Sequence, residues 1–284
     1  MAFGPLVSCE ELAQHLDDPT WLVLDCRYEL ADKEKGVRDY AKGHIPGSYH
    51  AHVDRDLSGP VGDGHRGRHP LPLPGAFQRF CGDRGIVPGT KVVVLDDAAG
   101  QWASRAWWLL RYYGHTDVAV LDGGMTRWKQ LKLPLRDLRE KPRKPVPFTN
   151  QPGAMPTTDA GAIAAGGITI LDARAPERFR GEVEPVDKKA GHIPGARSAP
   201  LAGNVGADMR FLAADKLRER FTALGATVGT GPAGAVACYC GSGVTATHNV
   251  LAMVLAGLPT PSLYPGSWSE WSWPEANRPV ATGP

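Results

Sequence analysis

The stretch WLVLDCR (Trp21–Arg27) decides the fold, because the chain repeats it as ITILDAR (Ile168–Arg174). A second pair of segments supports the repeat. GHTDVAVLDGGMTRW, which ends at Trp128, aligns without a gap with GLPTPSLYPGSWSEW, which ends at Trp271, at an offset of 143 positions. Self-similarity of this kind means that one structural unit occurs more than once. The sequence therefore predicts two copies of one unit, each of about 130 residues.

Each copy alternates apolar runs with helical patterns. The runs predict strands at 21–24, 91–95 and 118–121 in the first copy, and at 168–171, 235–238 and 262–264 in the second. Helical spacing of apolar residues lies between the last two runs of each copy, with the second of these helices expected at 245–256. Short β-branched runs joined by helices are typical of parallel strands that are buried on both faces. We therefore expect an α/β fold in which each copy is a parallel sheet flanked by helices.

A proline-rich stretch separates the two copies. Residues 138–159 (LREKPRKPVPFTNQPGAMPTTD) contain five prolines and several charged residues, and they show neither a helical nor a strand period. Stretches of this composition are extended and semi-rigid. We expect a first domain over 1–137, a linker over 138–155 and a second domain over 156–284.

Composition narrows the class of protein. The chain has 284 residues, of which 42% are hydrophobic and 22% are charged, so a globular protein is expected. Its net charge is +2 without a basic or acidic tail, so nucleic acid is not an expected partner. No apolar run of about 18 residues occurs, so we expect neither a signal peptide nor a membrane span. Five cysteines are an odd and sparse set, which favours a reducing compartment, the cytoplasm, over a disulfide framework.

The repeat also provides an internal control for function, since a residue that only one copy carries is a better functional candidate than a shared one. At the offset of 143, Cys240 aligns with Asp97, and Gly243 aligns with Gly100. The turn is thus expected in both copies, whereas the cysteine is an addition to it. A cysteine needed only for packing would more readily be matched by an apolar residue.

The chemistry of this turn favours a reactive thiol. The turn joins a strand to a helix, so successive backbone N–H groups and the helix N-terminus point into one concavity. A thiolate is stabilised there relative to a free cysteine, whose pKa is about 8.5, and a persulfide fits the same cradle. Gly241 and Gly243 permit close approach of the backbone. Cys238, two residues before Cys240 in the apolar run, is expected to be a buried structural thiol.

Two other interpretations of Cys240 are disfavoured. A zinc site needs three or four ligands, usually in paired clusters, but the chain has no second C-x-x-C, and His248 falls on the following helix. A phosphatase site of the C-x5-R type needs an arginine six residues after the cysteine, where this chain has Ala246.

Residues that both copies share are expected to be structural. GHIPG occurs twice, so its histidines, His44 and His192, belong to a backbone turn rather than to catalysis. Trp271 aligns with Trp128, and Trp268 aligns with an apolar methionine, so both tryptophans of GSWSEW are expected in the core.

The motifs LDCR…GHIPG, LDAR…GHIPG, CGSGVT and GSWSEW resemble those of the tandem-domain rhodanese sulfurtransferases, over nearly the whole chain. The resemblance implies two tandem rhodanese-like domains, the first inactive and the second carrying the catalytic cysteine. It implies transfer of sulfur from a small-molecule donor, through a Cys240 persulfide, to a thiol, cyanide or a thioredoxin-like acceptor, with no metal or organic cofactor. The loop is similar to that of the mercaptopyruvate enzymes, whereas thiosulfate-preferring members have basic residues where this chain has Gly241 and Ser242.

The resemblance also implies substrate-binding residues. The loop residues in this group are Gly241, Gly243, Val244 and Thr245. An arginine ahead of the second GHIPG binds the donor carboxylate in this family, and Arg178 matches it, with Arg180 as the nearby alternative. The counterpart of Arg178 in the first copy is Ala31, so only the second copy carries this arginine, as expected of a functional residue. The mercaptopyruvate enzymes have a second arginine nine residues on; here that position is Asp187, and Lys188 could replace the arginine only as a less directional charge.

A serine–histidine–aspartate relay that polarises the substrate is a further implication of the resemblance. Ser242 matches the loop position, and His69 and Asp54 match the other two positions by their order in the chain. They lie in a long glycine-rich loop that has no equivalent in the second copy. Asp56 and His65 are the alternatives. Such a relay predicts a site between the two domains.

Two other functions stay open. The chain could be a thiosulfate:cyanide sulfurtransferase, or a non-catalytic persulfide carrier or docking module. The carrier would keep Cys240 but would need neither Arg178 nor the relay, so steady-state turnover of a small donor separates it from an enzyme.

Overall fold

The structure is a computed structural model that describes residues 3–60, 65–226 and 235–284. These residues form two compact units. Unit 1 contains the described parts of 1–59, Pro72–Ala154 and Ala207–Arg210, and unit 2 contains the described parts of 60–71, Met155–Gly206 and 211–284. Residues 65–71 of the first sequence copy thus pack in unit 2. The domain and linker boundaries set at 137 and 155 from the sequence remain a prediction.

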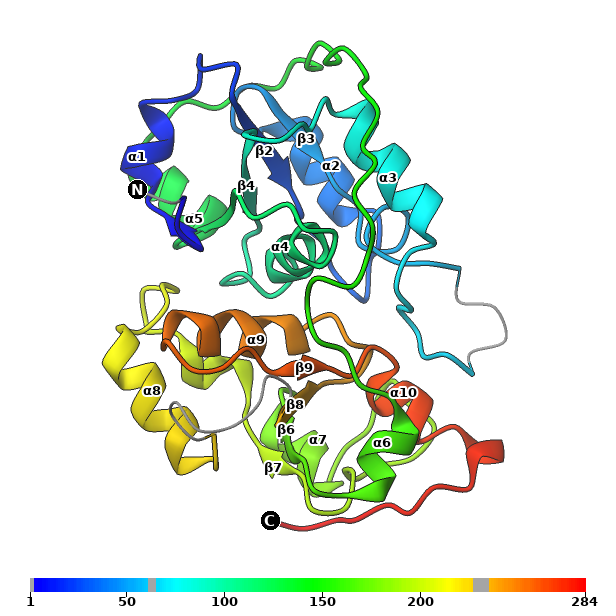
Figure 1. Ribbon diagram of the computed structural model, residues 1–284. Coiled ribbons are helices and arrows are strands. Elements are labelled where there is room, and N and C mark those ends of the chain that lie inside the picture. The colour runs from blue at the N-terminus through cyan, green and yellow to red at the C-terminus, as the bar shows by residue number, and fades with distance from the viewer. Residues whose placement is uncertain (1–2, 61–64, 227–234) are drawn as a thin grey trace. The chain divides into compact units, whose positions relative to one another are not determined.

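A parallel sheet forms the centre of unit 1 (Figure 1). In spatial order, its described strands are β1 (Leu6–Val7), β5 (Val118–Leu121), β4 (Lys91–Leu95), β2 (Trp21–Asp25) and β3 (Ser48–His50). Every adjacent pair is parallel. The helices are α1 (Cys9–Ala13), α2 (Lys35–Lys42), α3 (Pro74–Asp83), α4 (Ala103–Tyr112) and α5 (Gly124–Gln130).

Both faces of this sheet are buried, which explains why its strands are continuously apolar rather than alternating. Leu22, Leu24, Val92 and Val94 are at most 1% exposed. Alternate strand residues pack with α1 and α5 on one face. This cluster contains Val7, Cys9, Leu12, Trp21, Val23, Val93, Leu95, Ala119, Leu121, Met125 and Trp128.

Unit 2 repeats the same arrangement. In spatial order, its described strands are β7 (Arg197–Ser198), β6 (Thr169–Asp172), β8 (Val236–Tyr239) and β9 (Ser262–Leu263), all parallel. The helices are α6 (Ala160–Ala165), α7 (Pro176–Arg180), α8 (Ala214–Ala223), α9 (Ala246–Leu255) and α10 (Ser267–Trp271), with 3-10 turns η1 (Leu201–Asn204) and η2 (Pro274–Ala276). A parallel bridge from Thr157 to Leu263 takes the place that β1 has in unit 1. The predicted α/β fold with two parallel sheets is confirmed.

The repeated LDxR motif has one structural task in both units. Arg27 pairs with Asp25 (2.6 Å), and Arg174 pairs with Asp172 (2.7 Å), with all four side chains buried. Each guanidinium also donates to the carbonyl of the first glycine of the GHIPG that follows, at 2.9 and 2.6 Å. A buried ion pair needs such additional hydrogen bonds to offset its desolvation. Through these hydrogen bonds, the motif therefore links the carboxyl end of a strand to the GHIPG turn.

The other shared residues also have matched contacts. His44 and His192 each stack on the aromatic residue of the preceding helix, with ring centroids 4.0 and 3.8 Å apart. In each case Nδ1 lies 2.9 or 2.8 Å from the carbonyl oxygen of that aromatic residue. Trp128 and Trp271 each donate Nε1–H to a proline carbonyl at 2.8 Å. Trp268 and Trp271 lie in the core of unit 2, as expected.

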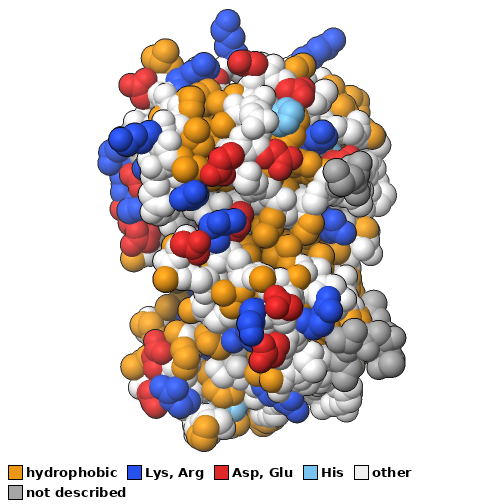
Figure 2. All heavy atoms as spheres, turned by 90° about the vertical axis from the view of Figure 1, so that its left-hand side faces the viewer, with side chains coloured by type: hydrophobic (Ala, Val, Ile, Leu, Met, Phe, Trp, Pro, Cys, Tyr) orange, Lys and Arg blue, Asp and Glu red, His pale blue; other side chains and the backbone are white. Residues whose placement is uncertain are grey.

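The surface agrees with the balanced composition. Figure 2 shows acidic and basic side chains interspersed over one face, without an extended patch of one sign. Within the described ranges, no helix combines the length and the apolar character needed to cross a membrane. All five cysteines are buried and unpaired.

Candidate active site

Cys240 lies at the carboxyl end of β8, where the chain turns into α9. It is 3% exposed. The N–H of Gly243 donates to the Cys240 Sγ at 3.2 Å, and the N–H of Cys240 itself donates to the Ser267 hydroxyl at 3.1 Å. Gly243 has a φ of +77°, and a Cβ there would lie 2.3 Å from the carbonyl oxygen of Pro265, so the turn requires glycine. The turn thus directs one backbone N–H at the sulfur, and we refer to it below as the cradle of unit 2.

The structure corrects the alignment of the two copies at this turn. The N–H of Met125 donates to the carbonyl of Asp96 (2.8 Å), just as the N–H of Trp268 donates to the carbonyl of Cys240 (2.9 Å). Asp96, and not Asp97, is therefore the counterpart of Cys240. Six residues separate Asp96 from the start of α4, whereas five separate Cys240 from the start of α9, so the ungapped alignment was wrong by one position in this loop.

The counterpart residue shows what the cradle accommodates. The Asp96 carboxylate is 1% exposed and accepts four backbone N–H groups at 2.7–2.9 Å. Burial raises the pKa of Asp96, and the four N–H groups oppose this rise. In unit 1 the cradle is thus filled by an anion-forming side chain of the protein itself, whereas in unit 2 it holds a thiol.

Ser267 is a contact residue that the sequence analysis missed. Its φ is +54°, a left-handed conformation that costs a non-glycine residue about 1–3 kcal/mol. Its hydroxyl is buried between the N–H of Cys240 and the carbonyl of Tyr264, to which it donates at 2.9 Å. At the offset of 143, unit 1 has Gly124, also with a φ of +54°. The exchange of glycine for serine between the two copies was the available signal in the sequence.

Arg178 projects from α7, which follows β6, the strand next to β8. Its Nη2 donates to Glu184 at 2.6 Å and to Asp187 at 3.0 Å, and its Nε donates to Glu184 at 3.3 Å. Arg178 is 18% exposed, whereas the two carboxylates are 4% and 2% exposed. Burial raises the pKa of Glu184, but the guanidinium of Arg178 and the backbone N–H of Asp187 outweigh burial and hold it below its usual value. Arg180, the alternative, is 38% exposed and pairs with Glu182.

Arg68 is a second guanidinium at this place, and the sequence analysis missed it. Its Nε and Nη2 donate to Asp187 at 2.9 and 3.3 Å. A Cβ built on Gly241 would lie 2.8 Å from Arg68 Nη2 and 3.5 Å from Arg178 Nη1. Both arginines therefore border the residue that follows Cys240. The available signal was Asp187, a carboxylate where the family has a cation.

The structure brings together two of the three relay residues. Ser242 Oγ lies 2.7 Å from His69 Nδ1, and both side chains are buried. Asp54 belongs to unit 1, where it accepts from the Tyr28 hydroxyl (3.0 Å) and pairs with Lys33 (2.9 Å). Its part in a relay, and a site between the domains, stay predictions.

The alternatives for the relay have other contacts. Asp56 accepts the backbone N–H of His52 at 2.7 Å, in unit 1. His65 is exposed and lies against the ring of Trp273, with centroids 5.0 Å apart. His69, by contrast, contacts Ser242 of the Cys240 loop.

The remaining loop residues and Cys238 are mostly buried. Val244 is buried, and Thr245 is half-buried directly before α9. Cys238 lies inside β8, is fully buried, and its pKa is raised by burial. A thiol in that position is difficult to ionise.

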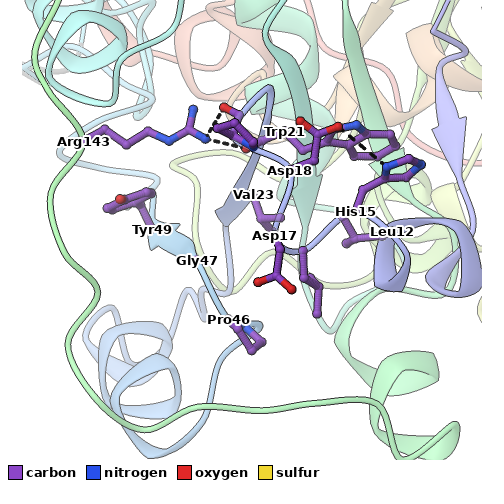
Figure 3. A pocket seen from close by; sticks show the side chains of 12 residues that line it. Leu12, His15, Asp17, Asp18, Trp21, Val23, Pro46, Gly47, Tyr49 and Arg143 are labelled. Carbon is purple, nitrogen blue, oxygen red and sulfur yellow. Dashed lines mark hydrogen bonds and ion pairs between the residues drawn. The ribbon is translucent and has the colours of Figure 1, made fainter.

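A separate surface pocket lies in unit 1 (Figure 3). His15 stacks on Trp21, with ring centroids 4.2 Å apart, and Arg143 donates to the carbonyls of Pro19 and Trp21. None of the predicted site residues lines this pocket.

Comparison with known proteins agrees with the two-unit fold. The family described as Rhodanese-like domain matches residues 8–131 and 159–272. The chain is 46% identical, over all of both chains, to "Probable 3-mercaptopyruvate sulfurtransferase" of Pseudomonas aeruginosa. It is 40% identical to "Putative thiosulfate sulfurtransferase SseB" of Mycobacterium tuberculosis, over 98% of this chain and 97% of that one. The structure of 3-mercaptopyruvate sulfurtransferase from Leishmania major superposes with a TM-score of 0.84 at 30% identity, covering 96% of this chain and 76% of that one.

Proposed function

We propose that this chain, which belongs to the rhodanese family of sulfurtransferases, takes a sulfur atom from 3-mercaptopyruvate and carries it as a persulfide on Cys240. The acceptor would be a small thiol, cyanide or a thioredoxin-like protein. With five unpaired cysteines, a reducing compartment, the cytoplasm, suits the chain.

One observation carries this proposal: the backbone cradle at the end of β8 holds a thiol, where the equivalent cradle of unit 1 holds a carboxylate. A persulfide ends in an anionic sulfur that is larger than a thiolate. Preorganised N–H groups stabilise such a charge without rearranging during the reaction. The cradle of unit 2 is thus suited to the proposed intermediate, whereas that of unit 1 is already filled.

The first half-reaction balances without an oxidant or reductant. The Cys240 thiolate attacks the thiol sulfur of 3-mercaptopyruvate, a sulfur–sulfur bond forms, and the bond between sulfur and C3 of the donor breaks. The electron pair of that bond goes to the three-carbon fragment. The proton of the donor thiol ends on C3, which gives pyruvate. Cys240 is left as an anionic persulfide.

The second half-reaction restores the enzyme. An acceptor thiolate attacks the outer sulfur of the persulfide, a new sulfur–sulfur bond forms on the acceptor, and the Cys240 thiolate leaves. Splitting the transfer into two steps avoids a direct meeting of donor and acceptor, and it predicts ping-pong kinetics.

The neighbouring side chains suit a donor with a carboxylate and a ketone. Arg178 reaches Gly241 with Nη1, and a guanidinium matches a carboxylate in geometry as well as in charge. We propose that Ser242, whose hydroxyl lies 2.7 Å from His69, donates a hydrogen bond to the ketone oxygen, where negative charge develops as pyruvate leaves. In the proposed relay, His69 and Asp54 orient that hydroxyl.

Thiosulfate is the second candidate donor. It is supported by the relative from M. tuberculosis, whose name includes that activity. In this case sulfite leaves in place of pyruvate.

Steady-state kinetics decides between the donors. We expect kcat/KM of the wild-type protein to be higher for 3-mercaptopyruvate than for thiosulfate. Release of pyruvate measures the first reaction, and release of sulfite measures the second. Faster turnover of thiosulfate would refute the proposed donor. Stoichiometric loading without turnover would instead indicate a carrier.

A further inference from the structure

Asp187 is a buried carboxylate that two guanidinium groups from distant parts of the chain share. Arg178 donates to its Oδ2 at 3.0 Å, and Arg68 donates to its Oδ1 at 2.9 Å. Asp187 is 2% exposed, so its charge requires partners. Its position fixes the two arginines beside one another.

Arg68 is held in unit 2 by its backbone as well as by its side chain. Its N–H donates to the Ser269 hydroxyl at 3.1 Å. The residue before it, Gly67, has a φ of +84° and approaches Gly266 so closely that a Cβ would lie 2.5 Å from the Gly266 carbonyl oxygen. The residue after it, His69, meets Ser242. Contacts of three consecutive residues thus anchor this segment in unit 2, and the Arg68 side chain is 25% exposed.

Both arginines retain unused donors, and both lie beside Gly241, the residue that follows Cys240. Among the described residues, the Nη1 group of Arg68 and that of Arg178 have no hydrogen-bond acceptor. Arg68 Nη2 lies within 2.8 Å of the point where a Cβ on Gly241 would be. The guanidinium of Arg68 therefore occupies the space that a side chain at position 241 would need, and it brings N–H donors to a loop without a charged side chain.

We propose that Arg68 is a donor-binding residue, and that Arg68 and Arg178, spaced by Asp187, form a clamp for the carboxylate of the sulfur donor. The proposal rests on the proposed function. The charges of Arg68 and Arg178 are cancelled by those of Asp187 and Glu184. The clamp therefore selects the sulfur donor by directed hydrogen bonds, which suit a planar carboxylate, rather than by net charge.

Alkylation of Cys240 tests the clamp without any assumption about the natural donor. Iodoacetate and iodoacetamide both react with the thiolate by displacement of iodide, but only iodoacetate has a carboxylate. The other four cysteines are at most 1% exposed, and the labelled peptide is identified by mass spectrometry.

The ratio of the two alkylation rates is the readout, because a general change in the reactivity of Cys240 would alter both rates alike. In Arg68→Ala, we expect the ratio of iodoacetate to iodoacetamide to fall by about 10-fold or more, since a hydrogen bond to a charged group contributes about 1.5–3 kcal/mol. In Arg68→Lys, which keeps the positive charge but loses the two-pronged guanidinium geometry, the ratio should lie between those of the wild type and Arg68→Ala. Arg180→Ala is the matched control and should keep the wild-type ratio. An unchanged ratio in Arg68→Ala would overturn the proposal; if that variant does not fold, an unchanged ratio in Arg68→Lys does so.

Turnover provides the second arm. In Arg68→Ala, we expect the KM for 3-mercaptopyruvate to rise about 10- to 100-fold, with a smaller change in kcat. An unchanged KM contradicts the clamp. If the wild-type protein does not turn over 3-mercaptopyruvate, the proposed donor fails, and the alkylation ratio still decides on Arg68.

Discussion

Replacing Arg178 with alanine removes a guanidinium that is both a support for two buried carboxylates and a candidate ligand for the donor. The substitution deletes hydrogen bonds of 2.6 and 3.0 Å to Glu184 and Asp187. Alanine is favourable in a helix, so α7 itself should persist. The effects on stability and on donor binding can therefore be measured in the same variant.

The expected loss of stability follows from the partners that remain. Breaking a buried ion pair costs about 3–5 kcal/mol when a charge is left without compensation. Here Glu184 keeps Arg174 at 3.3 Å, and Asp187 keeps Arg68 at 2.9 Å. We therefore expect the free energy of unfolding, measured by urea denaturation, to fall by only about 2 kcal/mol. The control, Arg180→Ala, breaks an exposed pair and should cost less than about 1 kcal/mol.

The kinetic effect is larger if Arg178 binds the donor. We expect the KM for 3-mercaptopyruvate to rise about 10- to 100-fold in Arg178→Ala, measured by pyruvate release, with kcat less affected. A loss of stability with an unchanged KM would show that Arg178 only supports the two carboxylates. A variant like the wild type in both respects would show that Arg178 is a solvated surface residue.

Two further predictions concern the buried carboxylates. Asp96→Ala leaves four buried N–H groups without an acceptor, at about 1–3 kcal/mol each if no water replaces the carboxylate, so urea should unfold unit 1 much more readily. The exposed neighbour supplies the control, Asp97→Ala, and equal stability of the two variants would contradict the role of the Asp96 carboxylate as acceptor of the four N–H groups. Because the pKa of Glu184 is held below its usual value, its ionised form stabilises the fold above about pH 4.3, and this contribution is lost as the pH falls through the lowered pKa. The difference in unfolding free energy between wild type and Glu184→Gln should therefore shrink below pH 4.3, and a constant difference would contradict the assignment.

The fold was predictable where the sequence signal is local. The strands at 91–95 and 118–121 were predicted with correct bounds, because continuous β-branched runs are sufficient to mark a strand buried on both faces. The two-residue strands β1 and β7 were not predicted, because they are too short to show a period.

The site was predictable only in part. Cys240 and Arg178 stand out when the two copies are compared, but an ungapped alignment cannot reveal the extra loop residue that makes Asp96 the counterpart of Cys240. Arg68 meets Asp187 across 119 positions of sequence, and no local pattern marks such a contact. The strain at Ser267 exists only in the backbone angles of the folded chain.

Mass spectrometry of the protein after incubation with 3-mercaptopyruvate tests the central claim most directly. We predict a gain of one sulfur atom on the peptide that contains Cys240, lost again when cyanide or a thiol is added. Cys238→Ser should load as the wild type does, because Cys238 is a buried strand residue, whereas Cys240→Ser should gain nothing and transfer nothing. Sulfur transfer that persists in Cys240→Ser would contradict the account.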